Sequence, residues 1–297
     1  MIYAIFVLVS LYTMSVLSVS LRQRLLSGGR SYGPLTLTDS PVVAEVLALT
    51  GYGHIVVDHD HSPTDVNSGQ RLLQAIQSSH SIASLEGRHP TEAIVRLPNH
   101  DPVYMKKVLD SMQLPGGVLV PMVEDAATAK EVVVSTRYPP SSDLRSASNE
   151  GTRGCAAPFV RATGWGRINT ETYLKQCQED LLVMVQVESE SGVMAIPSIA
   201  EVEGIDGILL GPFDLSCSIG KMGRFEDEDV KDLILKAEES VLASGCLLAG
   251  FQVPGRSVKE MFSRGYSLVC GSVDAGLIRN AAMIDLSAAQ EAIDSLP

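Results

Sequence analysis

Residues 182–210 read LVMVQVESESGVMAIPSIAEVEGIDGILL, and this stretch has the pattern of a strand, a helix and a second strand. The runs Leu182–Val187 and Asp206–Leu210 are short and rich in valine, isoleucine and leucine, which is typical of strands buried on both faces. Between them, Ser191–Val202 has the apolar spacing of an amphipathic helix. The stretch therefore predicts one βα unit of a parallel sheet.

The same alternation recurs from Gly33 to the end of the chain. The other strand candidates are Pro34–Leu37, His54–Asp58, Ala93–Leu97, Gly117–Pro121, Leu247–Phe251 and Tyr266–Cys270. The other helix candidates are Val42–Leu49, Asp65–Ser78, Pro102–Ser111, Ala126–Thr136, Glu226–Ser244 and Val258–Arg264. Near-continuous apolar strands with helices between them favour an α/β fold, a closed (β/α)8 TIM barrel. A doubly wound open sheet is the alternative.

The composition suits one large globular domain. With 297 residues, 45% of them hydrophobic and 20% charged, the chain can bury the core of a barrel, and we assign residues 21–297 to it. The net charge is −12, so we expect no nucleic-acid partner, because the overall field repels phosphates. The five cysteines form no CxxC pair and suggest no disulfide framework, which favours a reducing, cytoplasmic compartment.

Residues 1–20 form a separate hydrophobic segment, MIYAIFVLVSLYTMSVLSVS, which carries no charge and precedes Arg22 and Arg24. Its length suits a marginal membrane span or the core of a signal peptide. It lacks the positively charged start and the small-residue cleavage site of a good signal peptide. A membrane anchor, an export signal, a buried helix and a misassigned start codon all remain open. We expect contact with a membrane only if the segment is a real anchor.

In a parallel barrel, functional residues lie at the C-terminal ends of the strands and in the loops that follow. These positions hold Asp58-His59-Asp60-His61, Arg96, Glu188 and Asp214. Two separated carboxylates suit a hard cation such as Mg²⁺ or Mn²⁺. Such a cation can stabilise the enolate that forms when a 2-oxo acid loses its substituent at C3. Arg96 would add a fixed positive charge, and His61 is the candidate for proton transfer.

Most of these residues also have a purely structural explanation. Acids that follow strands often cap the next helix, which would account for Glu188 and Asp214. His61 could belong to an ordinary polar loop before a helix. A zinc site built from nearby histidines is disfavoured, because His54 opens its strand and would lie at the opposite end. Arg96 is harder to explain in this way, because an arginine buried in an apolar strand must be paired.

The most distinctive motif joins the fifth and sixth strands. Residues 185–189 read VQVES and residues 202–216 read VEGIDGILLGPFDLS; LVPMV at 119–123 and STRYPP at 135–140 support it. These segments resemble the HpcH/HpaI aldolase family, which includes 2-dehydro-3-deoxy-glucarate and 2-oxo-heptenedioate aldolases. The resemblance extends from about Arg24 to the end of the chain. It implies a TIM barrel of the phosphoenolpyruvate/pyruvate type.

The resemblance implies a class II aldolase, a metal-dependent aldehyde-lyase that cleaves or forms 4-hydroxy-2-oxo acids through a pyruvate enolate. By position, Glu188 and Asp214 match the family's metal ligands, with Mg²⁺ or Mn²⁺ expected and Co²⁺ also possible. Gln186 and the backbone around Phe213 match the groups that contact the bound oxo acid. The expected partners are a 2-oxo acid, an aldehyde and further copies of the chain, as in a hexamer.

The resemblance also assigns three catalytic residues. Arg96 matches the arginine that stabilises the enolate, and His61 matches the catalytic histidine. Asp110 matches the aspartate that pairs with this histidine and raises its basicity, which is the general effect of a carboxylate beside an imidazole. Without the resemblance, Asp110 would be interpreted as a surface acid at the end of a helix.

Three segments depart from the family's pattern. The usual Asp-Gly-Glu-His is Asp58-His59-Asp60-His61 here, which replaces glycine by a bulky ring and shortens the acid by one methylene. Residues 141–152 lengthen the connection that leads to Arg153-Gly154, near the expected substrate mouth. Ile82–Glu92 extends the connection before the third strand, and we expect a surface loop there.

Two other functions stay open. A citrate-lyase-like acyl-CoA lyase is one alternative, although no Gly-rich nucleotide-binding loop is evident and the tail after the eighth strand looks short. A degenerate, non-catalytic barrel that acts as a binding scaffold is the other, suggested by the altered Asp58–His61 and by residues 1–20. A scaffold, however, has no physical need for the complete set of candidate catalytic and metal-binding side chains.

Overall fold

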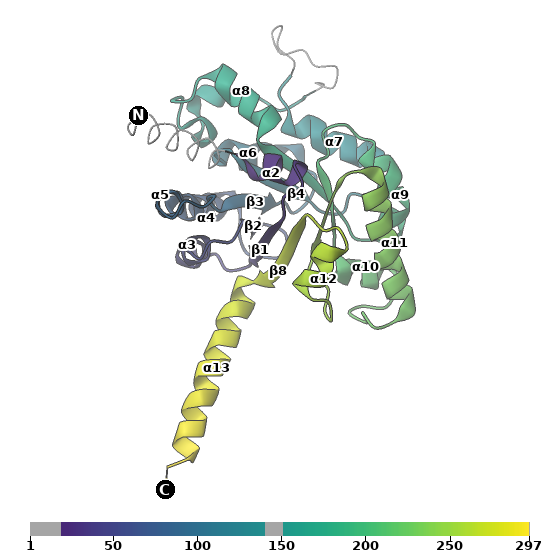
Figure 1. Cartoon of the computed structure of the whole chain (residues 1–297). Coiled ribbons are helices and arrows are strands. Elements are labelled where there is room, and N and C mark those ends of the chain that lie inside the picture. The colour runs from purple at the N-terminus through teal and green to yellow at the C-terminus, as the bar shows by residue number, and fades with distance from the viewer. Residues whose placement is uncertain (1–18, 140–150, 297) are drawn as a thin grey trace, which may run out of the picture.

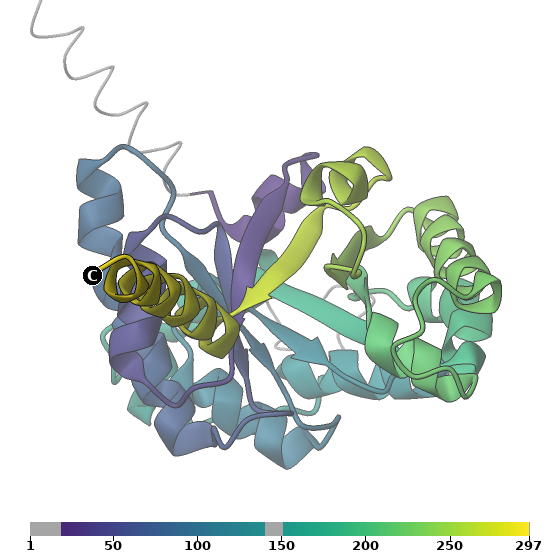
Figure 2. The ribbon, with the colours of Figure 1, turned by 90° about the horizontal axis from the view of Figure 1, so that it is seen from below.

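The computed structural model describes residues 19–139 and 151–296, and its strands form one closed parallel barrel. The strands are β1 (Ser31–Thr36), β2 (His54–Asp58), β3 (Glu92–Arg96), β4 (Gly116–Val120), β5 (Leu181–Val187), β6 (Gly207–Leu210), β7 (Leu247–Phe251) and β8 (Leu268–Val273). They pair in chain order, and β1 pairs with β8 to close the ring (Figures 1 and 2). The predicted TIM barrel is confirmed, and the open-sheet alternative is excluded.

The helices surround the barrel. Those that match predicted segments are α3 (Pro41–Leu49), α4 (Val66–Ser78), α6 (Pro102–Ser111), α7 (Ala126–Thr136), α9 (Glu190–Ala200), α11 (Glu228–Ser244) and α12 (Val258–Ser263). Those without a prediction are α2 (Leu21–Leu26), α5 (His80–Leu85), α8 (Thr170–Glu179), α10 (Pro212–Ser218) and α13 (Asp274–Asp294). Three of the five have only six or seven residues, too few for a helical period to be recognised.

The strands are apolar on both faces because each face has its own packing partner. In β2, Val56 points into the barrel and packs in the interior cluster with Ile94 and Leu119. Its neighbours Ile55 and Val57 belong to the cluster between the sheet and the surrounding helices. Because successive side chains of a strand point to opposite faces, both faces must be apolar. This explains the near-continuous runs in the sequence.

Capping side chains begin several helices just after the strands end. A backbone N–H in the first helical turn donates to each of Ser40, Asp65, Asp125, Ser189 and Ser257. At α4, Asp65 and Ser68 exchange hydrogen bonds in a reciprocal capping box. These caps set where each helix starts, and so they limit how far each loop at the barrel mouth can move.

Helix α2 closes the N-terminal end of the barrel. Leu21 and Leu25 join the interior cluster. The buried Glu92 carboxylate accepts hydrogen bonds from the Leu21 N–H at 2.6 Å and from Arg24 at 3.1 Å. Residues 1–18, nearly all of the predicted segment 1–20, lie outside the described residues. Within the described ranges, no helix has the length and apolar content needed to cross a membrane.

Two connections differ from expectation. The surface loop predicted for Ile82–Glu92 is wrong at its start, because α5 continues to Leu85 and buries Ala83 completely. The expectation of a short tail is also wrong, because α13 has 21 residues and projects away from the barrel (Figure 1). Its base is anchored by the buried Asp274 carboxylate, which accepts hydrogen bonds from the backbone N–H groups of Leu37 and Thr38 at 2.8 and 3.0 Å.

Candidate active site

The candidate site lies at the C-terminal end of the barrel, directly above the interior cluster. Asp58, Arg96 and Gln186 each follow an interior apolar residue by two positions, so they point inward from the same face of their strands. All three are buried. A pocket of about 440 Å³ opens here between the ends of β1, β3, β6, β7 and β8. Three of the predicted site residues with ionisable side chains line it: His61, Arg96 and Asp214.

The Asp58 carboxylate organises the first part of the site. It accepts hydrogen bonds from Arg96 Nε and Nη2 at 2.8 and 2.7 Å. It also accepts the backbone N–H of Asp60 at 3.0 Å and, more weakly, that of His61 at 3.4 Å. One fully buried carboxylate therefore holds both the guanidinium and the loop that carries the histidine. The sequence placed Asp58 in the candidate set but gave it no role, because a contact between β2 and β3 is not visible in the sequence.

The charge of Arg96 is stabilised by its partners. Burial alone would lower its pKa, but the hydrogen bonds and negative charge of Asp58, assisted by Asp60 and Glu188, outweigh this effect and raise the pKa. The guanidinium also lies 5.3 Å from the centre of the Phe251 ring, a cation–π distance. Arg96 is therefore a fixed, permanently positive group in the pocket wall, as its position within an apolar strand predicted.

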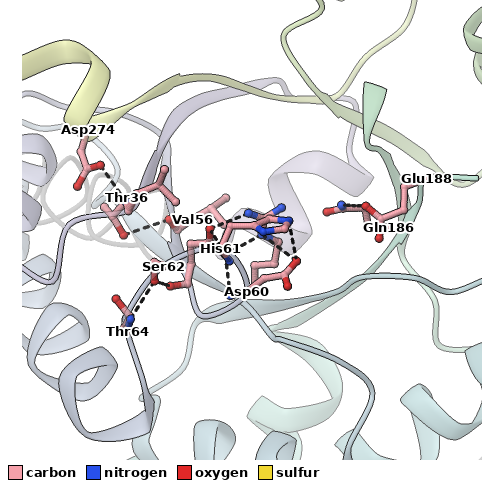
Figure 3. Close-up of polar contacts among 12 residues, drawn as sticks. Thr36, Val56, Asp60, His61, Ser62, Thr64, Gln186, Glu188 and Asp274 are labelled. Carbon is pink, nitrogen blue, oxygen red and sulfur yellow. Dashed lines mark hydrogen bonds and ion pairs between the residues drawn. The ribbon is translucent and has the colours of Figure 1, made fainter. Parts of the chain in front are cut away.

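Gln186, near the end of β5, and Glu188, which directly follows this strand, form a second group. The Gln186 amide donates to Glu188 Oε2, and the backbone N–H of Met122 donates to Glu188 Oε1 at 2.7 Å. Met122 has a φ of 55°, a left-handed conformation that non-glycine residues rarely adopt. A Cβ at Gly211 would lie 3.0 Å from Glu188 Cβ, so only glycine fits there without displacement. Figure 3 shows the Gln186–Glu188 pair across from the loop that carries Asp60 and His61.

The carboxylates of the site repel one another. Burial raises the pKa of Glu188, and the charges of Asp214 and Asp60 raise it further. Burial likewise raises the pKa of Asp60, with smaller increases from Asp58 and Asp214. A group of carboxylate oxygens that repel one another is the kind of ligand set that a hard divalent cation prefers.

A divalent cation fits these residues. Gln186 Oε1 is buried and has no hydrogen-bond partner in the part of the chain that the structure describes. Within the same ranges, no three acidic, histidine or cysteine side chains cluster closely enough to enclose a metal ion. Glu188 and Asp214 would therefore supply two ligands, with water and substrate completing the shell, as is usual for Mg²⁺.

The structure does not bring Asp110 to His61. Asp110 lies near the end of α6, where its carboxylate accepts a hydrogen bond from Arg153 at 2.7 Å. The histidine ring lines the pocket, is 65% exposed, and lies 3.7 Å from the carboxylate of Asp60. No contact between Asp110 and His61 occurs in residues 19–139. Within one chain, Asp60 is therefore the carboxylate beside the histidine.

His59, which stands where the family usually has glycine, has a defined socket. Its Nδ1 shares a hydrogen bond of 3.0 Å with the Tyr104 hydroxyl, and the ring packs against Gly69 of α4. A Cβ at Gly69 would lie 2.3 Å from His59 Nε2, so the ring occupies space that only glycine leaves open. Burial lowers the pKa of His59 to about 4, so the imidazole is neutral near pH 7. The bulky ring thus points away from the pocket into the space between β2 and α4.

The loop after β6 completes the site. Asp214 and Phe213 lie in the first turn of α10, and both line the pocket. The Phe213 ring is 53% exposed and packs edge-on against Phe225, with ring centres 4.9 Å apart. Of the long insertion at 141–152, residues 141–150 lie outside the described ranges. The expectation that it borders the substrate mouth stays a prediction.

A closed (β/α)8 barrel whose mouth combines acidic side chains, a paired guanidinium and a histidine is suited to a lyase that acts on a carbonyl substrate. The chain belongs to the HpcH/HpaI aldolase/citrate lyase family, whose model matches residues 35–281.

Named relatives narrow the activity. The chain is 33% identical over 263 residues to the hydroxypyruvate/pyruvate aldolase of Chromohalobacter salexigens, covering 88% of this chain and 94% of that protein. It is 33% identical over 243 residues to the 4-hydroxy-2-oxo-heptane-1,7-dioate aldolase of Escherichia coli, covering 80% and 82%. The structure is similar to that of an HpcH/HpaI aldolase/citrate lyase family protein from Burkholderia cenocepacia J2315, with a TM-score of 0.81, 29% identity and coverage of 92% of this chain and 100% of that one.

These relatives confirm the predicted class. The chain is an aldolase, and the citrate-lyase-like alternative is less favoured. Enzymes of this family generally depend on a divalent metal.

Proposed function

We propose that this aldolase cleaves or forms 4-hydroxy-2-oxo acids, with pyruvate or a close relative and an aldehyde as the smaller partners. The observation that carries the proposal is that His61, Arg96 and Asp214 line one pocket, with Asp60 and Glu188 near enough to Asp214 for their charges to influence each other. The names of the relatives support it, since they describe aldolases of pyruvate and of a 4-hydroxy-2-oxo acid.

Glu188 and Asp214 would hold the divalent cation, for which we propose Mg²⁺ or Mn²⁺, with Co²⁺ as a further candidate. When bound, the cation supplies Lewis-acid polarisation of the 2-oxo group. The unpartnered Gln186 oxygen and the backbone around Phe213 would orient the bound oxo acid.

His61 and Arg96 supply the remaining chemistry. In the cleavage direction, His61 accepts the proton of the C4 hydroxyl group. The C3–C4 bond then breaks, its electron pair forms the C2–C3 double bond of the enolate, and the aldehyde leaves. The Arg96 guanidinium stabilises the negative charge on the enolate oxygen. A proton returned to C3 yields pyruvate, and synthesis runs through the same steps in reverse.

Pyruvate release from a panel of 4-hydroxy-2-oxo acids tests the proposal. The purified full-length protein is expected to release pyruvate with Mg²⁺, Mn²⁺ or Co²⁺, followed by NADH oxidation with a coupled dehydrogenase. EDTA should abolish the release, and excess cation should restore it. A folded protein that neither releases pyruvate nor binds a divalent cation would instead support the degenerate-scaffold hypothesis.

We also propose that the enzyme is a homo-oligomer that uses α13 as a contact. Every described side chain from Ile278 to Leu296 is exposed. The apolar ones are Ile278, Met283, Ile284, Leu286, Ile293 and Leu296. A projecting helix with this apolar surface gains most of its stability from packing, and its own barrel contacts only its base.

The variant Ile284→Glu tests this contact, because it places a charge in the proposed interface. It is expected to elute as a smaller species than the wild type when mass is measured by light scattering after gel filtration. Gln290→Glu, which adds the same charge to an exposed polar position of α13, is the matched control. A monomeric wild type, or an unchanged mass for Ile284→Glu, would contradict the proposal.

A further inference from the structure

The pocket has two unlike sides. The charged side holds Arg96, His61 and Asp214. The opposite side lies over the ends of β1, β7 and β8, and most of its lining is apolar: Leu35, Phe251, Cys270 and Val273. The polar side chains on this second side are Gln252 and Ser272, both neutral and both half-buried. A substrate bound at the charged side would extend its remaining atoms over this neutral surface.

The charges of the site oppose a second anionic group. Among the pocket-lining residues in the described ranges, Arg96 is the only lysine or arginine, and its Nε and Nη2 donors are already bound to Asp58. Asp58 and Asp60 lie 2.7 and 3.9 Å from this guanidinium, and Glu188 is near enough for its charge to raise the pKa of Arg96. The described pocket lining therefore offers no free lysine or arginine for a second anionic group, because its one guanidinium is already paired with Asp58 and an acidic side chain, Asp214, lies in the same lining.

We infer that the aldehyde partner of this enzyme is short and uncharged, and that it carries hydroxyl rather than carboxylate groups. The inference rests on the proposed aldol chemistry and names the class of its second substrate. A carboxylate over β7 and β8 would lose water and meet no cation except Arg96, which lies 5.3 Å from the Phe251 ring and is already paired with Asp58, so its burial there is costly. It would also lie close to like charge.

Two neutral groups could recognise a hydroxyl group. The Gln252 amide nitrogen donates to the backbone carbonyl of Arg256 at 2.9 Å. The side-chain oxygen of Gln252 is therefore left as the acceptor for a ligand. Ser272 Oγ lies 3.5 Å from the Tyr32 hydroxyl, the outer limit of a hydrogen bond, so it can turn to a better partner. Both groups lie beside the apolar lining, where a short chain would pack.

The wild-type enzyme provides the direct test. Addition of pyruvate to glycolaldehyde and to succinic semialdehyde is measured with Mn²⁺ in separate assays, as kcat/KM for each aldehyde. The value for glycolaldehyde is expected to exceed that for succinic semialdehyde by about tenfold or more, because like-charge contacts cost several kcal/mol. An equal or higher value for succinic semialdehyde overturns the inference.

A pair of variants locates the effect. Ser272→Arg places a cation on the neutral side and is expected to shift the ratio at least about tenfold toward succinic semialdehyde. Ser272→Gln adds a long neutral side chain and should leave the order of the two aldehydes unchanged. If Ser272→Gln shifts the ratio as much as Ser272→Arg does, side-chain size and not charge controls selection, and the inference fails.

Failure of the inference and failure of the proposed function give different results. Exchange of the pyruvate C3 protons with D₂O, followed by NMR, reports enolate formation without any aldehyde. Exchange together with a preference for succinic semialdehyde would overturn only the aldehyde class. Absence of both exchange and addition would overturn the proposed function, and the inference with it.

Discussion

Replacing Glu188 with glutamine is expected to lower pyruvate release by about a thousandfold or more, because a Lewis-acid cation contributes several kcal/mol to catalysis. Glutamine keeps the size of the side chain; its one carbonyl oxygen can accept the N–H of Met122, and its amide N–H can donate to the oxygen of Gln186 once that amide turns over. It removes the negative charge that would hold the cation. Binding of Mn²⁺ alone, measured by calorimetry, is expected to weaken in parallel with activity.

The same substitution should not destabilise the protein. Burial and the nearby carboxylates raise the pKa of Glu188, so its charge is unfavourable for folding in the absence of metal. The melting temperature without cation is therefore expected to stay level or rise, as is common for functional sites that carry strain. Glu190→Gln, an exposed acid at the start of α9, is the matched control. Full activity in Glu188→Gln, with Mn²⁺ binding retained, would contradict the assignment.

The second large effect is expected at Asp58, which no substrate needs to touch. Asp58→Ala leaves the buried Arg96 without its partner, and breaking a buried ion pair in this way typically costs about 3–5 kcal/mol of stability. Asp58→Asn keeps the shape but removes the charge. It is expected to fold and to lose about a hundredfold in kcat, since small displacements of catalytic groups have effects of this size.

The Asp58 variants separate positioning from general stability. If Asp58 positions Arg96 and His61, Asp58→Asn lowers kcat even at temperatures where the variant is fully folded by circular dichroism. Asp39→Asn is the control, because it weakens an exposed aspartate–arginine pair with Arg71 at 3.6 Å. It should change neither quantity appreciably. A variant Asp58→Asn with wild-type kcat would show that Arg96 is held by other contacts.

Much of the barrel was predictable because its pattern is local. Strands such as His54–Asp58 and Leu247–Phe251 have the same bounds in the sequence analysis and in the structure. Each is an apolar run buried on both faces, and a run of this kind is evident without knowing its neighbours. The short helices α5 and α10 were not predicted, because six or seven residues carry too little periodicity. Helix α13 was not predicted, because it buries almost no side chain against its own barrel and so has no clear apolar face in the sequence.

The candidate site was predictable in composition but only partly in its contacts. The rule that strand ends face one mouth brought Arg96, His61 and Asp214 to one pocket, as expected. The pairing of Asp110 was not predictable, since its carboxylate turns to Arg153, a residue 43 positions away along the chain. The space that the His59 ring fills exists because residue 69 in the following helix is a glycine. A single glycine within a helix does not indicate in the sequence which side chain packs against it.

The sequence alone determined the fold class, the family and the kinds of side chain at the barrel mouth, because alternation and strand-end position depend only on order along the chain. Tertiary structure alone decided which of those side chains meet. Asp58 became the partner of Arg96 because β2 and β3 lie side by side in the register that sets these two residues opposite each other. The excess of negative charge, and the neutral side of the pocket, arise from residues far apart in sequence whose charges act through space.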